Sequence, residues 1–166
     1  MPTLEQKTRH SANRYWLAFL LTGARGESAD LAIEAIDSPG DNAFFSAWML
    51  AWSRRVVISK ALAAIRQELA DSARRIAQDR GPRYARSLPR DWSLPPSAGK
   101  LELERALLAI DAFPRCVLLL MLFEGLSLDD ATVLLDVDRD LVRKAQVFAL
   151  QELTRNLAVT REAARV

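Results

Sequence analysis

Three apolar helical patterns follow one another between residues 101 and 153, and helix start and stop signals separate them. The missing N–H of Pro114 costs nothing in the first turn of a helix, so this proline is well placed to open one. Gly125 is expected to end that helix in the left-handed conformation, which glycine adopts without a Cβ penalty. These signals predict a set of short packed helices in the second half of the chain.

The next two joints predict a short helix, a tight turn and a longer helix. Ser127 offers a side-chain oxygen to the amides of a helix over residues 128–135, with Asp130 three residues further on. Asp136 marks the expected end of this helix, and Asp138 is the expected N-cap of a last helix that runs to about residue 153. This order is the helix-turn-helix pattern, although any small helical bundle also contains short helices and tight turns.

The composition limits the fold and the function. The chain has 166 residues, of which 50% are hydrophobic, and it has only one histidine and one cysteine, Cys116, which we expect to be buried and inert. Six glycines and the lack of a sustained alternating pattern predict an all-α fold. The spacings typical of nucleotide and zinc sites do not occur. We therefore expect no enzymatic activity, cofactor, metal or small-molecule substrate.

Targeting signals are also lacking. The longest apolar run, residues 116–123, is much shorter than the roughly 18 residues that a membrane span needs. The first ten residues have no apolar signal core. We therefore expect no membrane contact and a cytoplasmic protein.

The first half of the chain predicts three further helices. The first spans residues 11–21 and is stopped by Gly23, and the second spans 28–36. A long third helix follows Asp41 or Asn42, with a kink or a change of packing partner expected near Val57. Residues 81–100 contain four of the seven prolines and read as a basic linker. The expected domains are thus a helical one over residues 1–80 and a helix-turn-helix domain over residues 101–166.

A family resemblance accompanies these patterns. The run F-P-R-C-V-L-L-L-M-L-F-E-G-L-S-L-D-D-A-T-V-L-L-D-V-D-R-D-L-V-R-K resembles the C-terminal promoter-reading domain of bacterial extracytoplasmic-function sigma factors. In the first half, L-L-T-G-A-R-G-E-S-A-D-L-A-I-E-A-I is similar to the family's clamp-binding segment, and A-W-M-L-A-W-S-R-R-V-V-I to the helix that reads and melts the −10 element. The resemblance implies a transcription factor that binds RNA polymerase core and promoter DNA.

The resemblance also implies candidate site residues. Asp30, Leu31 and Glu34 match the clamp-binding motif and are the candidates for polymerase contact. Arg54 matches the −10 helix, and the adjacent Arg55 stands where the family has asparagine, so we expect both to contact DNA.

The last expected helix supplies the other DNA candidates, Arg139, Arg143 and Lys144. Residues 54–100 hold eleven basic and four acidic residues, a net charge of +7, whereas residues 101–153 hold five basic and ten acidic ones, a net charge of −5. A domain that reads DNA usually gains most of its affinity by neutralising phosphates. The acidic second half therefore leaves a second interpretation open.

That alternative is a sigma mimic. Certain bacterial stress-response regulators contain a sigma-like domain that captures an anti-sigma protein instead of reading a promoter, and their I-L-D-x-D-x-x-x-V turn is similar to residues 134–142. Phe148 stands where the sigma family usually has arginine, and as an exposed aromatic it would be a candidate anchor for a protein partner.

Overall fold

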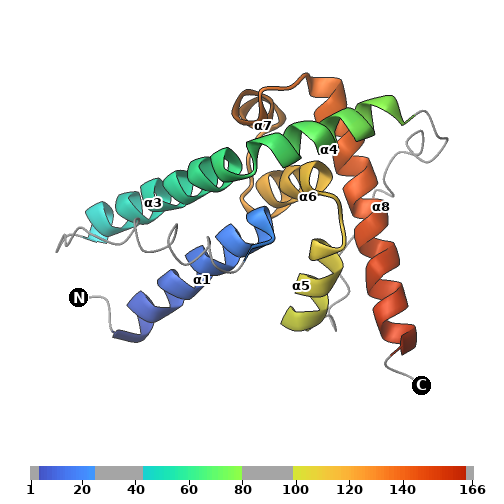
Figure 1. Ribbon diagram of the computed structural model, residues 1–166. Helices are drawn as coiled ribbons and strands as arrows, with labels where there is room; N and C mark the ends of the chain where they lie inside the picture. Colours follow the sequence, from blue (N-terminus) through green and yellow to red (C-terminus); the bar gives the residue numbers. More distant parts are fainter. Residues whose placement is uncertain (1–3, 25–42, 80–98, 164–166) are drawn as a thin grey trace. The chain divides into compact units, whose positions relative to one another are not determined.

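The computed structural model describes residues 4–24, 43–79 and 99–163, and every regular element within these ranges is a helix (Figure 1). The predicted all-α class is therefore confirmed for the described part of the chain. Residue contacts divide the chain into two units, Met1–Arg66 and Gln67–Val166. This division falls before the expected linker, most of which, residues 81–98, lies outside the described residues.

The first unit contains α1 (Leu4–Thr22) and α3 (Ala43–Ala64), which contact each other and run in the same general direction (Figure 1). The buried face of α3 includes a row of smaller side chains at four-residue spacing, Ser53, Val57 and Ala61, beside the larger Ile58 and Leu62, and Ala18 of α1 is also fully buried. Ala18 and Val57 form one buried cluster. Small residues on facing helices let the backbones approach closely and make many weak dispersion contacts.

Two expectations for the first unit have different outcomes. Gly23 ends α1 with φ +74°, and its N–H donates to the Phe19 carbonyl over 2.7 Å, as predicted for a glycine stop. Near Val57, where the sequence predicts a kink or a change of packing partner, α3 is unbroken and continues to Ala64. The chain turns at Ile65 instead and resumes as α4 (Arg66–Gln78). The expected helix over residues 28–36 and its neighbouring cap lie outside the described residues.

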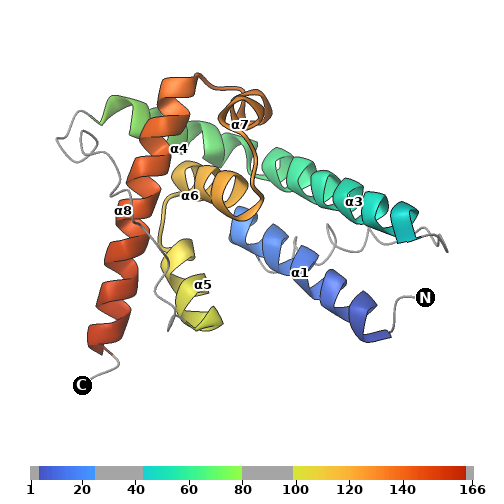
Figure 2. The same ribbon diagram turned by 180° about the vertical axis from the view of Figure 1, so that it is seen from behind.

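The second unit contains nearly all of α4, followed by α5 (Lys100–Leu108), α6 (Ala112–Leu118), the π-helical turn η2 (Leu119–Phe123), α7 (Leu128–Leu135) and α8 (Arg139–Ala163). The long helix α8 contacts α5, α6 and α7, as the view in Figure 2 shows. The core consists of apolar side chains from these helices that are almost fully buried, among them Leu107, Phe113, Val117, Leu118, Leu120, Val142, Ala149 and Leu153.

The joint between α6 and α7 follows the predicted signals. The Asp111 carboxylate caps α6 by accepting from the Ala112 N–H (2.9 Å), and Pro114 lies in the first turn. The widened turn η2 then leads to Gly125, whose φ of +69° confirms the expected left-handed position. The Ser127 hydroxyl accepts from the Asp130 N–H over 3.0 Å, and α7 has the predicted bounds.

Candidate functional site

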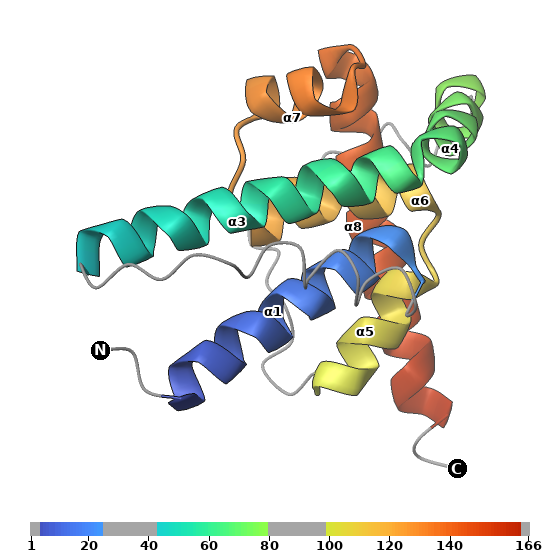
Figure 3. The ribbon, with the colours of Figure 1, turned by 60° about the vertical axis from the view of Figure 1, so that its left-hand side comes forward.

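A turn of three residues, Asp136 to Asp138, joins α7 to α8 (Figure 3). Asp136 has φ +54°, a left-handed conformation that aspartate tolerates better than most residues with a Cβ. Asp138 caps α8, because its Oδ1 accepts from the Leu141 N–H over 2.8 Å. The cap confirms the predicted start of α8, which extends ten residues beyond the expected end, to Ala163.

Two of the three basic residues predicted for this segment of α8 are solvent-exposed and lie beside carboxylates. Arg139 is paired with Asp129 of α7 over 3.2 Å, and its side chain is 55% exposed. Arg143 is 4.0 Å from Asp140 on the same helix and is 62% exposed. Exposed pairs of this kind contribute little free energy, about 0–1 kcal/mol, and exchange readily for other partners. Both guanidinium groups are therefore accessible to an incoming anion.

Lys144 has a different environment. Its Nζ donates to the Asp79 carbonyl over 2.6 Å and to the Ala77 carbonyl over 3.3 Å, both at the C-terminal end of α4. Carbonyl groups at a helix C-terminus lack intrahelical partners and carry partial negative charge, so a lysine there is stabilising. The ammonium thus binds protein backbone, an arrangement that sequence reasoning missed because its partners lie more than 60 residues away in the chain.

The inner face of α8 packs on the core, and Phe148 lies closer to it than the sequence analysis expected. Val142 and Ala145 are fully buried, and Phe148 is half-buried. The expectation of an exposed aromatic anchor at Phe148 is therefore wrong, because this ring lies close to the side of the helix that packs on the core. Part of its surface remains accessible.

Carboxylates surround the start of α8. Asp129, Asp130, Asp136, Asp138 and Asp140 are all exposed. Two of them pair with the arginines described above, and Asp138 caps the helix. The local field around Arg139 and Arg143 is consequently less positive than two arginines alone would give, which reduces the attraction for a phosphate backbone.

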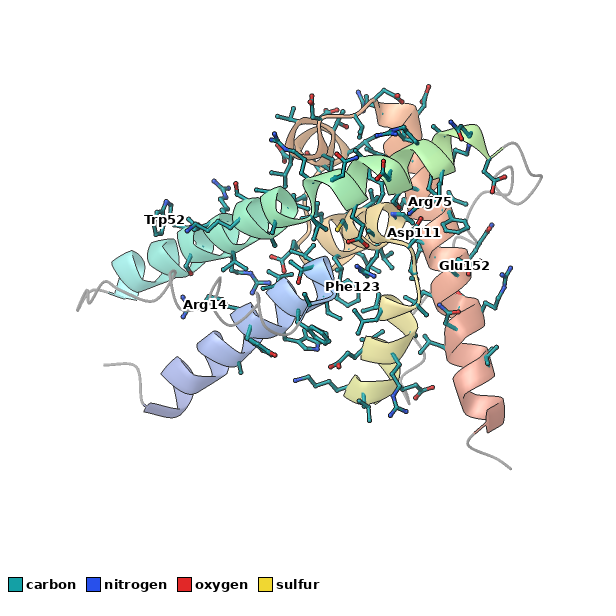
Figure 4. All side chains as sticks on the ribbon, in the orientation of Figure 1. Arg14, Trp52, Arg75, Asp111, Phe123 and Glu152 are labelled. Carbon is teal, nitrogen blue, oxygen red and sulfur yellow. The ribbon has the colours of Figure 1, made fainter. Side chains whose placement is uncertain are left out.

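Polar side chains of α4 also hold the start of α6. Arg75 makes a bidentate pair with Asp111, with Nε to Oδ2 at 2.9 Å and Nη2 to Oδ1 at 2.8 Å, and the two side chains point toward each other in Figure 4. The buried Ser72 hydroxyl accepts from the Phe113 N–H over 2.9 Å. These contacts make α4 part of the second unit.

The same contacts set the ionisation of Asp111. Burial alone would raise the pKa of its carboxyl group, but hydrogen bonds from Arg75, Ser72 and the Ala112 amide, together with the charge of Arg75, lower the pKa overall. The hydrogen bond with Asp111 in turn raises the pKa of Arg75. Both groups are therefore charged at neutral pH.

Cys116 is fully buried in α6, as expected, and burial raises the pKa of its thiol to about 12. A thiol with so high a pKa is almost entirely protonated at neutral pH and is a poor nucleophile. Within the described ranges, no group of histidine, cysteine, aspartate or glutamate side chains is arranged to hold a metal ion.

The candidates of the first unit are only partly described. Arg54 and Arg55 are exposed on α3, and the side chain of the neighbouring Trp52 is 47% exposed. Asp30, Leu31 and Glu34, the candidates for polymerase contact, lie outside the described residues.

Comparison of the chain with family models, curated proteins and solved structures finds no match of any of the three kinds. In the described part, no helix has both the length and the apolarity needed to cross a bilayer.

Proposed function

We propose that this chain is a sigma-factor-like transcription regulator that binds promoter DNA and the RNA polymerase core to direct transcription initiation. The observation that carries the proposal is the pair α7 and α8, a short capped helix joined by three residues to a long capped helix. Helix-turn-helix proteins use this order to present the second helix to the major groove. The sequence resemblance supplies the functional class.

In this proposal, the start of α8 contacts DNA through Arg139 and Arg143, whose weak exposed pairs are exchanged for phosphate or base contacts. Lys144 is assigned a structural role first, because its ammonium holds the end of α4. Arg54 and Arg55 of α3 supply a second basic site. Contact with the polymerase clamp is assigned to Asp30, Leu31 and Glu34 from the resemblance alone.

A salt titration of DNA binding tests whether Arg139 and Arg143 contact DNA. Each phosphate contact steepens the fall of log affinity with log salt by roughly 0.9, so replacing Arg139 and Arg143 by glutamine is expected to flatten the slope by about 1.8. The matched control is the double variant Arg105→Gln and Arg155→Gln, which removes two exposed arginines of the same unit away from the start of α8. Fluorescence anisotropy of a labelled duplex measures both slopes. Equal slopes for the two double variants would refute DNA contact by α8.

A second candidate function is a sigma mimic that binds an anti-sigma factor or another protein without reading DNA. The exposed carboxylates around the start of α8 favour it, because they repel phosphate and attract a basic protein surface. The partly accessible Phe148 would then lie near the edge of the protein interface.

One charge variant separates the two candidates. Asp129→Asn combined with Asp140→Asn removes the carboxylates that pair with Arg139 and Arg143. A DNA-reading α8 gains affinity for duplex DNA when these carboxylates are neutralised. A mimic shows no DNA binding in either form, and the same variant loses affinity for its basic partner.

A further inference from the structure

The outer face of α7 turns away from the core of the second unit. Its four residues follow one another at helical spacings of three and four, and all are exposed: Asp129, Asp130, Val133 and Leu134. Ala131 and Leu135 are buried on the opposite side of the helix. Val133 is 82% exposed, the highest value among the large apolar side chains that the structure describes.

This face combines an apolar centre with a charged border. Val133 and Leu134 are neighbours, so their exposed surfaces join, whereas a single exposed apolar side chain is ordinary on a protein surface. Asp129 and Asp130 lie one helical turn before the apolar pair, and the exposed Asp136 follows it. An apolar centre with a polar rim is the usual composition of a surface that binds another protein.

The charge of the border determines the kind of partner. Carboxylates repel the phosphates of nucleic acids and the anionic headgroups of a membrane surface. A symmetric dimer through this face would bring the carboxylates of both copies into one interface. The partner that matches the face is a protein segment in which an apolar side chain is flanked by lysine or arginine.

We propose that the outer face of α7 binds a basic amphipathic segment of a partner protein. An apolar side chain of that segment covers Val133 and Leu134, and a lysine or arginine pairs with Asp129. The present pair of Asp129 with Arg139 is exposed and weak, so it exchanges readily for the incoming cation. The inference does not rest on the proposed function, because contact of Arg139 with DNA would leave Asp129 available to the partner.

Photochemical crosslinking from position 133 tests the surface in the full chain. Benzoylphenylalanine is placed at residue 133 of the tagged chain in its own cells, and the matched position is Val159, a second exposed valine of the same unit near the end of α8. We expect position 133 to be crosslinked more than position 159, to a segment in which apolar residues alternate with lysine or arginine. No excess over position 159, an acidic captured segment, or a second copy of this chain overturns the proposal.

A peptide of defined composition measures the two contacts separately. The probe is a fluorescein-labelled helical peptide with leucine on one face and lysine beside it, and serine replaces each leucine in its control. Val133→Ser is expected to weaken binding of the leucine peptide about tenfold, a common effect of removing a central apolar contact, while Val159→Ser leaves it unchanged. Asp129→Asn should weaken binding of both peptides more than Glu68→Gln, which removes an exposed carboxylate of α4.

Equal affinity of Val133→Ser and Val159→Ser for the leucine peptide overturns the docking surface. Equal affinity of the unmodified chain for the leucine and serine peptides also overturns it, because attraction by charge alone does not need the apolar pair. These measurements contain no DNA, so the salt titration of duplex binding decides the proposed function separately.

Discussion

The Ser72→Ala variant should destabilise the second unit, because it leaves a buried amide without its acceptor. The Phe113 N–H belongs to the first turn of α6, where amides have no intrahelical partner, and it donates to the Ser72 hydroxyl over 2.9 Å. Both residues are fully buried, so water does not replace the hydroxyl. An unsatisfied buried amide costs about 2 kcal/mol, and the better helix propensity of alanine offsets about 0.5 kcal/mol of it. The expected net loss is about 1.5 kcal/mol.

Cys116 provides the assay, because it is the only cysteine in the chain and is fully buried in the second unit. A thiol reagent modifies it only when that unit opens, and at low reagent concentration the rate follows the equilibrium population of the open form. A loss of about 1.5 kcal/mol corresponds to labelling roughly tenfold faster. Ser59→Ala is the matched control, since Ser59 is exposed on α3 in the first unit. Equal labelling rates for the two variants would refute the role of α4 in the second unit.

Three further predictions concern the same unit. Gly125→Ala should lower the free energy of unfolding by about 1 kcal/mol, so that Cys116 is labelled about fivefold faster, because φ is +69° and no atom lies within 4 Å of the added Cβ, which leaves backbone strain as the cause. Gly125→Asn should cost less, and an unchanged labelling rate for the alanine variant would contradict the strain. The pKa of Asp111 is lower in the folded chain than the roughly 3.9 of an unfolded one. The Asp111 carboxylate therefore contributes its full stabilisation of the fold above about pH 3.9, and this contribution is lost as the pH falls through the pKa of the folded chain. Acid unfolding followed by circular dichroism should therefore be shallower for Asp111→Asn, and an identical acid limb would count against the pair with Arg75. Limited proteolysis should cut first within the proline-rich residues 81–98. The two fragments should stay together in size-exclusion chromatography, because α4 packs with the C-terminal helices, and separate elution of the fragments would contradict that packing.

Local signals in the sequence predicted the joints of the second unit well. Gly125, Ser127 and Asp138 each act through groups no more than a few residues away, so their spacing alone determines the helix ends. The bounds of α7 follow from two such signals. The end of α8 was predicted ten residues too early, because the sequence after residue 153 contains neither glycine nor proline to mark it.

Contacts between distant segments were not predictable in the same way. The break at Ile65 has no glycine or proline beside it, and the apolar pattern of α3 continues into α4 without a change of period. The expected domain boundary therefore followed the prolines after residue 81, whereas Ser72, Arg75 and Lys144 bind partners 36 to 67 residues away and assign α4 to the second unit. The sequence pattern also placed Lys144 with the DNA contacts, because it gives the position of a cation on a helix but not the carbonyl groups that the cation binds.

Purification of the tagged full chain from its own cells, followed by identification of the bound proteins, tests the central proposal most directly. A sigma-factor-like regulator is expected to retain the subunits of core RNA polymerase. A variant with alanine at Asp30, Leu31 and Glu34, the residues assigned to the clamp, should lose them, and an equally tagged Arg105→Gln variant should keep them. Retention of one small protein in place of polymerase would support the mimic. Recovery of neither polymerase nor such a partner, under conditions that preserve both complexes, would contradict a sigma-like function of either kind.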